Sequence, residues 1–121
     1  MRTTRSVWLE VTENALYEGG RARDSNEVYF TLDRREAEFF GAEPVVIRTA
    51  DGRYFSALAS GHGGARERPG HAKNLRSQPA TRFGEWLKGR LGVTEPGGRL
   101  QVTDLGDGSY WARYLPPEGP R

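Results

Sequence analysis

The sequence predicts an α+β domain, mainly β, in which six or seven short strands form a sheet that curls into a barrel-like closure. Two observations lead to this fold class. Several short segments alternate apolar and polar residues with a period of two, and turn residues separate them. Two other segments carry apolar residues at helical spacing. We expect one domain over residues 1–116 and a disordered tail over residues 117–121.

The first two strands are predicted from alternation alone. Residues 6–12 carry an apolar residue at every second position from Val7, and residues 26–32 do the same from Val28. Such alternation is typical of a strand with one buried face. The intervening residues 13–26 are mostly polar and contain a Gly-Gly pair, which predicts a long loop.

A short helix is predicted directly after the second strand. Asp33 is a favoured N-cap residue, and Glu36 stands three positions later, which is the spacing of a capping box. Gly41 provides a helix stop. We expect Phe39 and Phe40, at the end of this helix, to anchor it to the core.

Two hairpins are predicted from their turn residues. Residues 45–60 contain two β-type runs joined by Ala-Asp-Gly, which begins at position 50. Residues 98–116 contain two more runs, joined by Gly-Asp-Gly, which begins at position 106. Glycine next to aspartate between two alternating runs is typical of a hairpin turn.

A second helix is predicted over about residues 80–91, with Gly92 as its stop. Its apolar residues recur at i, i+3, i+4 and i+8. They are Phe83, Trp86, Leu87 and Leu91. We expect Trp86, and also Trp111 in the last hairpin, to be core residues rather than stacking platforms for a ligand.

Residues 60–79 do not fit this pattern. They contain four Gly, two Pro, two His, three Arg and one Lys against one acidic residue, and they have little to bury. The wider segment 60–90 has a net charge of +5, whereas the rest of the chain has a net charge of −3. Such a segment favours a polyanionic partner, although a solvated basic loop has the same composition.

The composition excludes several classes of protein. The chain has no Cys, which removes disulfides, thiolate metal sites and thiol nucleophiles. No apolar run approaches the roughly 20 residues that a membrane-spanning helix needs, and the N-terminus lacks the apolar core of a signal peptide. We therefore expect a soluble, cytoplasmic protein that needs no cofactor.

The sequence offers little support for catalysis. His62 and His71 are the two histidines, and Glu67 is the one carboxylate between them, which is a weak basis for a metal site. No Gly-x-Ser-x-Gly elbow supports a Ser-His-Asp triad. We predict that the chain is not an enzyme, and the alternative is a small nuclease that acts through His62 or His71.

Nucleic acid is the better match for the two long polar segments. Arg and Lys neutralise phosphates, Arg also reads guanine, and Asn and Gln read adenine. The candidate contact residues of the first segment are Arg21, Arg23, Asp24, Ser25 and Asn26. Those of the second are His62, Arg66, Arg68, His71, Lys73, Asn74, Arg76 and Gln78, with Arg82 close behind. The prediction depends on their grouping, because one such arginine alone is more often a solvated surface charge.

Three motifs resemble those of the B3-like DNA-binding domain. They are Asn26-x-x-Tyr29, Phe39-Phe40, and the ten-residue run from Phe83 to Gly92. This domain occurs in plant transcription factors and as the target-recognition part of bacterial restriction endonucleases. The likeness is greatest to the bacterial form fused to phospholipase-D-type nucleases. It covers about residues 7–115, and most of its motif positions belong to the core and the turns.

The resemblance implies a seven-stranded open pseudobarrel with two short helices. Two arms, about residues 13–26 and 60–76, would grip the major groove of double-stranded DNA through the candidate residues named above. The resemblance also implies a target-recognition module of a restriction or related defence system, whose nuclease resides in a separate chain or in another part. The alternative is an RNA or single-stranded nucleic-acid binding barrel, which needs exposed aromatic residues on one sheet face.

Overall fold

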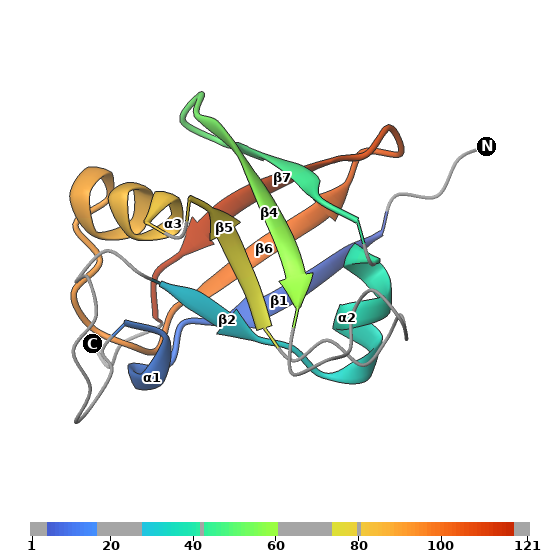
Figure 1. Cartoon of the computed structure of the whole chain (residues 1–121). Helices are drawn as coiled ribbons and strands as arrows, with labels where there is room; N and C mark the ends of the chain where they lie inside the picture. Colours follow the sequence, from blue (N-terminus) through green and yellow to red (C-terminus); the bar gives the residue numbers. More distant parts are fainter. Residues whose placement is uncertain (1–4, 17–27, 42, 61–73, 80, 118–121) are drawn as a thin grey trace.

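A computed structural model describes residues 5–16, 28–41, 43–60, 74–79 and 81–117 (Figure 1). The strands in these ranges are β1 (Ser6–Glu10), β2 (Tyr29–Thr31), β3 (Val45–Thr49), β4 (Tyr54–Ser60), β5 (Asn74–Gln78), β6 (Arg99–Asp104) and β7 (Ser109–Leu115). The helical segments are α1 (Glu13–Leu16), α2 (Arg34–Phe40), α3 (Arg82–Gly84) and η1 (Glu85–Arg90), a π-helix that continues α3.

The strands form one seven-stranded sheet in the order β1-β6-β7-β3-β4-β5-β2. Neighbouring strands are antiparallel except for β3 and β7, which are parallel. The edge strands β1 and β2 lie beside each other, so the sheet curls into a nearly closed barrel. In Figure 1, β4, β5 and β2 lie in front of β7, β6 and β1, and the two main helices lie at opposite ends. The predicted fold class is confirmed.

Helix α2 begins and ends as predicted. The Asp33 carboxylate accepts a hydrogen bond from the Glu36 N–H at 2.8 Å, and the Glu36 carboxylate accepts one from the Asp33 N–H at 2.9 Å. These two bonds are the predicted capping box. Gly41 follows the helix with a φ of +77°, which favours glycine. Phe39 and Phe40 are both buried, which confirms that they anchor the helix.

The core centres on Phe83, which points from α3 into the barrel and is fully buried. The rings of Phe30 on β2 and Phe55 on β4 meet it edge-on, with centroids 5.0 and 5.1 Å away. At the α2 end, the Tyr110 hydroxyl donates to the Phe39 carbonyl oxygen at 2.8 Å, and burial raises the pKa of Tyr110. Edge-on aromatic pairs add stability beyond the area they bury.

The second helix spans nearly its predicted range, but its second half is wound as a π-helix. The Leu91 N–H donates to the carbonyl oxygen of Trp86, five residues earlier, at 2.9 Å. The wider turn rotates Leu91 away from the buried helix face, and Leu91 is 40% exposed. The predicted burial of Leu91 is wrong, because it assumed a uniform α-helical period. Gly92 ends the helix as predicted, with a φ of +72°.

The two tryptophans predicted to be core residues have different environments. Trp86 is 1% exposed, as predicted. On β7, Tyr110 and Ala112 point into the barrel, so Trp111 between them points outward and is only half-buried. The prediction is therefore wrong for Trp111, because strand spacing alone does not show which of the two alternating faces is buried.

The first predicted loop begins with a helical turn, α1, and the first arm therefore does not start at residue 13. The Thr12 side chain accepts a hydrogen bond from the Ala15 N–H at 3.1 Å and so caps this turn. Ala15 and Leu16 are buried. The Lys88 ammonium donates to the Leu16 carbonyl oxygen at 2.7 Å, which ties α1 to η1.

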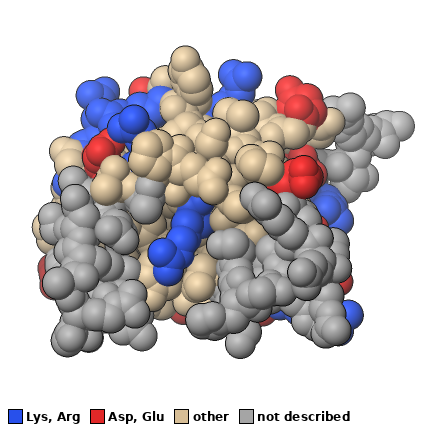
Figure 2. Space-filling model, in the orientation of Figure 1, with Lys and Arg blue, Asp and Glu red and all other residues tan. Residues whose placement is uncertain are grey.

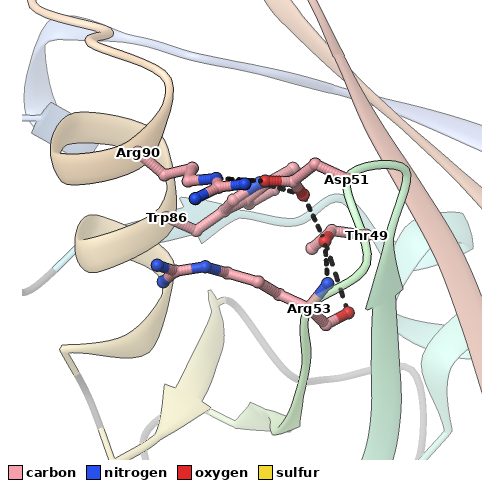
Figure 3. Close-up of polar contacts among 5 residues, drawn as sticks. All are labelled: Thr49, Asp51, Arg53, Trp86 and Arg90. Atoms are coloured by element: carbon pink, nitrogen blue, oxygen red, sulfur yellow. Dashed lines mark hydrogen bonds and ion pairs between the residues drawn. The ribbon is translucent and has the colours of Figure 1, made fainter.

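Asp51 ties the β3–β4 turn to η1 (Figure 3). Its carboxylate accepts hydrogen bonds from the Thr49 hydroxyl, from Trp86 Nε1 at 3.0 Å and from Arg90 Nε at 3.1 Å. The Thr49 hydroxyl also accepts a bond from the Arg53 backbone N–H at 2.9 Å, which closes the turn. These bonds hold the pKa of Asp51 below its usual range, and the bond from Thr49 has the largest effect.

Candidate nucleic-acid interface

Most of the predicted contact residues lie outside the described ranges. They are Arg21, Arg23, Asp24, Ser25, Asn26, His62, Arg66, Arg68, His71 and Lys73. Asn74, Arg76 and Gln78 are described, and all three lie on strand β5. Their assignment to a loop is wrong, and the second arm, predicted over residues 60–76, therefore cannot extend past residue 73.

Strand β5 forms although it has a single large apolar residue. Leu75 is fully buried, and the next inward residue, Ser77, is 2% exposed. The Ser77 hydroxyl accepts a hydrogen bond from the Phe83 N–H at 3.0 Å, which joins β5 to α3. Pairing with β4 on one side and β2 on the other provides hydrogen-bond partners for its backbone. The outward positions of the strand are Asn74, Arg76 and Gln78.

The sheet register surrounds these residues with outward side chains of β2 and β4. Arg76 pairs with Tyr29 on β2 and with Leu58 on β4. Its Cζ atom lies 4.7 Å from the centroid of the Tyr29 ring, a cation–π contact across the two strands. The other cross-strand pairs are Thr31 with Asn74 and Ser56 with Gln78. We call this surface the β5 face: Tyr29, Thr31, Ser56, Leu58, Asn74, Arg76 and Gln78.

The β5 face has positive charge and no carboxylate of its own. Strands β2, β4 and β5 contain no Asp or Glu. Figure 2 shows a basic side chain over this part of the surface, whereas acidic side chains are visible at the upper right, toward the end of the barrel with α2 and the β6–β7 turn. The electrostatic character of the face therefore suits an anion better than a cation.

Arg82, at the edge of the β5 face, is already paired. Its guanidinium lies 2.8 Å from the Glu85 carboxylate. This hydrogen bond, followed by that of Thr81, lowers the pKa of Glu85. Because both partners are exposed, the pair is weak, and a phosphate could replace the carboxylate at little cost.

The two segments predicted as arms attach to opposite ends of the β5 face. Residues 17–27 lead into Val28, directly before β2, and residues 61–73 join β4 to β5. In the antiparallel β2–β5 pair, Tyr29 lies opposite Arg76 and Thr31 lies opposite Asn74. The first segment therefore enters at the Arg76 end and the second at the Asn74 end.

Four further residues complete the β5 face and were not predicted from the sequence: Tyr29, Thr31, Ser56 and Leu58. A usable signal was present for Tyr29, since the alternation that places Val28 and Phe30 inward places Tyr29 outward. No comparable signal identified Ser56 and Leu58 on β4, because the strand register brings together residues that are far apart in sequence.

Within the described ranges, no three His, Cys, Asp or Glu side chains lie together in a way that could hold a metal ion. His62 and His71 lie outside these ranges. In the same ranges, no helix is long and apolar enough to cross a membrane.

Comparison with known proteins supports the fold. No protein-family model and no curated protein matches the sequence. The structure is similar to that of the hypothetical Arabidopsis thaliana protein At1g16640.1, with a TM-score of 0.55 and 12% sequence identity. The match covers 98% of this chain and 96% of that chain. At this identity the likeness shows a shared barrel fold and nothing further.

Proposed function

We propose that this chain is a double-stranded DNA-binding domain that recognises a specific sequence through the major groove. The observation that carries the proposal is the β5 face, which has no carboxylate and holds Arg76 over Tyr29, between the attachment points of two arginine-containing segments. The sequence motifs resemble those of the B3-like domain, and the fold shared with the Arabidopsis thaliana protein is a barrel of the kind that this resemblance implies.

The side chains of the β5 face are suited to reading bases, and those of the second segment are suited to contacting phosphates. The Tyr29 ring restricts the Arg76 guanidinium to one region, which favours the planar, two-bond contact that arginine makes with guanine. Asn74 is of the type that reads adenine. Arg66 and Arg68, in the second segment, would contact phosphates and so set the orientation of the barrel on the duplex.

The proposed biological role is that of a target-recognition module in a bacterial restriction or related defence system. Its support is the sequence resemblance to the bacterial form of the domain. In this proposal the chain has no catalytic role, acts in the cytoplasm, and works with a nuclease located in a separate chain or in another part of the protein.

The first test is selection from a random pool of DNA duplexes at about 150 mM salt, followed by sequencing of the retained DNA. We expect one short motif to be enriched. With about five phosphates neutralised, log affinity should fall against log salt concentration with a slope of about −4 to −5. Binding without enrichment would refute sequence recognition, and the absence of binding would refute the proposal as a whole.

Two sets of variants test the interface. Arg76→Gln should weaken binding of the selected duplex about 5- to 150-fold, the range for loss of one good base contact. The double variant Arg66→Glu, Arg68→Glu should abolish binding. Both should keep the melting temperature within about 2 °C of the parent protein. Arg34→Gln is the matched control, because Arg34 is 77% exposed on α2 and lies outside the β5 face.

The nuclease alternative has a separate test. Incubation with plasmid DNA and Mg²⁺ should leave the plasmid intact. Cleavage that disappears in His62→Ala or His71→Ala would assign the chain a catalytic role and overturn this part of the proposal.

A further inference from the structure

The opposite side of the barrel carries exposed aromatic and arginine side chains. Trp8 on β1 is 41% exposed, although its neighbour Leu9 is buried. The Arg99 Cζ atom lies 4.8 Å from the centroid of the Trp8 ring, so a guanidinium stacks against the indole. An indole left this exposed on a strand contributes little to the core of the barrel.

The register extends this pair into two rows across β1, β6 and β7. One row runs from Trp8 through Gln101 to Arg113, and the Arg113 Nε donates to Gln101 Oε1 at 2.8 Å. The adjacent row ends at the half-buried Trp111, opposite Thr103. Two strand spacings separate the ends of each row, about 10 Å. We call this surface the β6 face: Trp8, Arg99, Gln101, Thr103, Trp111 and Arg113.

The first row leads to an apolar hollow. The Ala50 N–H donates to the Ala112 carbonyl oxygen at 3.0 Å, which continues the β3–β7 pairing beyond β3. The hollow beside this point has a volume of about 390 Å³, and its walls include Leu91, Arg113 and Tyr114. This volume falls within the range of small-molecule pockets, about 300–1,000 Å³. The π-helical turn contributes to the hollow, because it leaves Leu91 exposed.

The charges on the β6 face also favour an anion. Arg99 and Arg113 are exposed, and Arg48 lies beside Trp111 on β3. Glu10 is opposite Arg99 in the register and reduces the positive charge at that edge. Asp51, at the hollow, is already paired with Arg90 at 3.1 Å. Glu10, Asp33 and Glu36 line the hollow beside Trp8, so the positive charge of this face is concentrated at Arg113 and Arg48, next to Trp111.

We propose that the β6 face and the adjoining hollow bind a short unpaired stretch of nucleic acid, separately from the β5 face. Every base has a π-face, so bases stack on aromatic rings or on arginine planes without sequence preference. The Trp8–Arg99 stack offers one such plane, Arg113 faces the backbone phosphates, and the hollow at Leu91 and Tyr114 receives one unstacked base. The two faces meet between β1 and β2, where Trp8 and Thr31 line the same hollow. Strands β6 and β7 lie behind β4 and β5 (Figure 1), so a ligand centred on Arg113 would leave Arg76 accessible.

The test measures binding of a fluorescent oligo(dT) of about 12 nucleotides beside a DNA hairpin that carries the selected duplex. We expect the full chain to bind oligo(dT) and to lose tryptophan fluorescence as it does so. Trp8→Ala should lower oligo(dT) affinity about 5- to 150-fold, the range for one stacked base, and change duplex affinity less than about twofold. Arg76→Gln should lower duplex affinity about 5- to 150-fold and change oligo(dT) affinity less than about twofold. Thermal melts establish that each variant is folded.

A matched pair of leucines tests the hollow. Leu91→Glu places a negative charge at its rim and should weaken oligo(dT) binding, whereas Leu105→Glu places the same charge in the β6–β7 turn and should not. These leucines are 40% and 39% exposed.

Two results would overturn the inference: no oligo(dT) binding by the parent protein at about 50 mM salt, or equal losses for oligo(dT) and duplex in Trp8→Ala. If the parent protein binds oligo(dT) but not the duplex, the proposed duplex function is refuted and this inference stands.

Discussion

Asp51→Ala should destabilise the barrel, because it removes the acceptor for a buried indole N–H. Trp86 is 1% exposed, and its Nε1 donates to the Asp51 carboxylate at 3.0 Å (Figure 3). A buried donor left without a partner costs about 1–3 kcal/mol. The bond from Arg90 adds less, about 0.2–1 kcal/mol, because that side chain is 55% exposed. We expect the free energy of unfolding to fall by about 2–3 kcal/mol, which lowers the melting temperature by about 6–18 °C.

The assay is urea unfolding followed by circular dichroism, with Asp51→Asn as the comparison. Asparagine keeps an oxygen for the Trp86 N–H but loses the ion pair with Arg90, so the expected loss is about 1 kcal/mol or less. In a Trp86→Phe background, which lacks the donor, Asp51→Ala should cost about 1–3 kcal/mol less than in the parent protein. The reasoning is refuted if Asp51→Ala stays within about 0.5 kcal/mol of the parent, or if Ala and Asn destabilise equally.

The same carboxylate predicts a pH dependence. Hydrogen bonds, first from Thr49 and then from Trp86 and Arg90, hold the folded-state pKa of Asp51 below its usual value of 3.8. The ionised form is therefore favoured in the folded state, so its contribution is present above that usual value and is lost as pH falls through the folded-state pKa. Between about pH 5 and pH 2, the melting temperature of the parent protein should fall more steeply than that of Asp51→Asn. Parallel curves would contradict this assignment.

Three further substitutions test the fold by urea or thermal unfolding. Leu75→Ala should cost about 2–5 kcal/mol, because Leu75 is the one large buried residue of β5, and a loss below about 1 kcal/mol would contradict the placement of this strand. Leu87→Ala should cost a similar amount while Leu91→Ala costs less than about 1 kcal/mol, so equal losses would argue against the π-helical turn. Asp33→Ala removes the N-cap of α2 and should cost about 1 kcal/mol, whereas no change would show that the capping box contributes nothing.

Features that depend on neighbours in sequence were predictable. The capping box of Asp33 and Glu36 and the helix stop at Gly41 were all predicted from positions a few residues apart. The hairpin turns and the strand around Leu9 likewise follow from local turn residues and alternation. Such features need no information about the rest of the chain, because the interactions that form them are local.

The candidate interface was predictable only in part. Arg76 and Asn74 were expected to contact DNA from a flexible loop, and the structure places them on β5 instead. With Leu75 as its one large apolar residue, this segment has too weak a pattern to be recognised alone. Pairing with β2 and β4 makes it a strand, and those partners come from distant parts of the chain.

By itself, the sequence determined the mainly β class, the helix boundaries near Asp33 and Gly92, and a concentration of positive charge over residues 60–90. Only the tertiary structure decided which side chains share a surface. Trp111 faces outward because of the register of β7, and Leu91 is exposed because of the π-helical turn. Register and helix winding depend on long-range packing, so the direction of a side chain cannot be obtained from spacing alone.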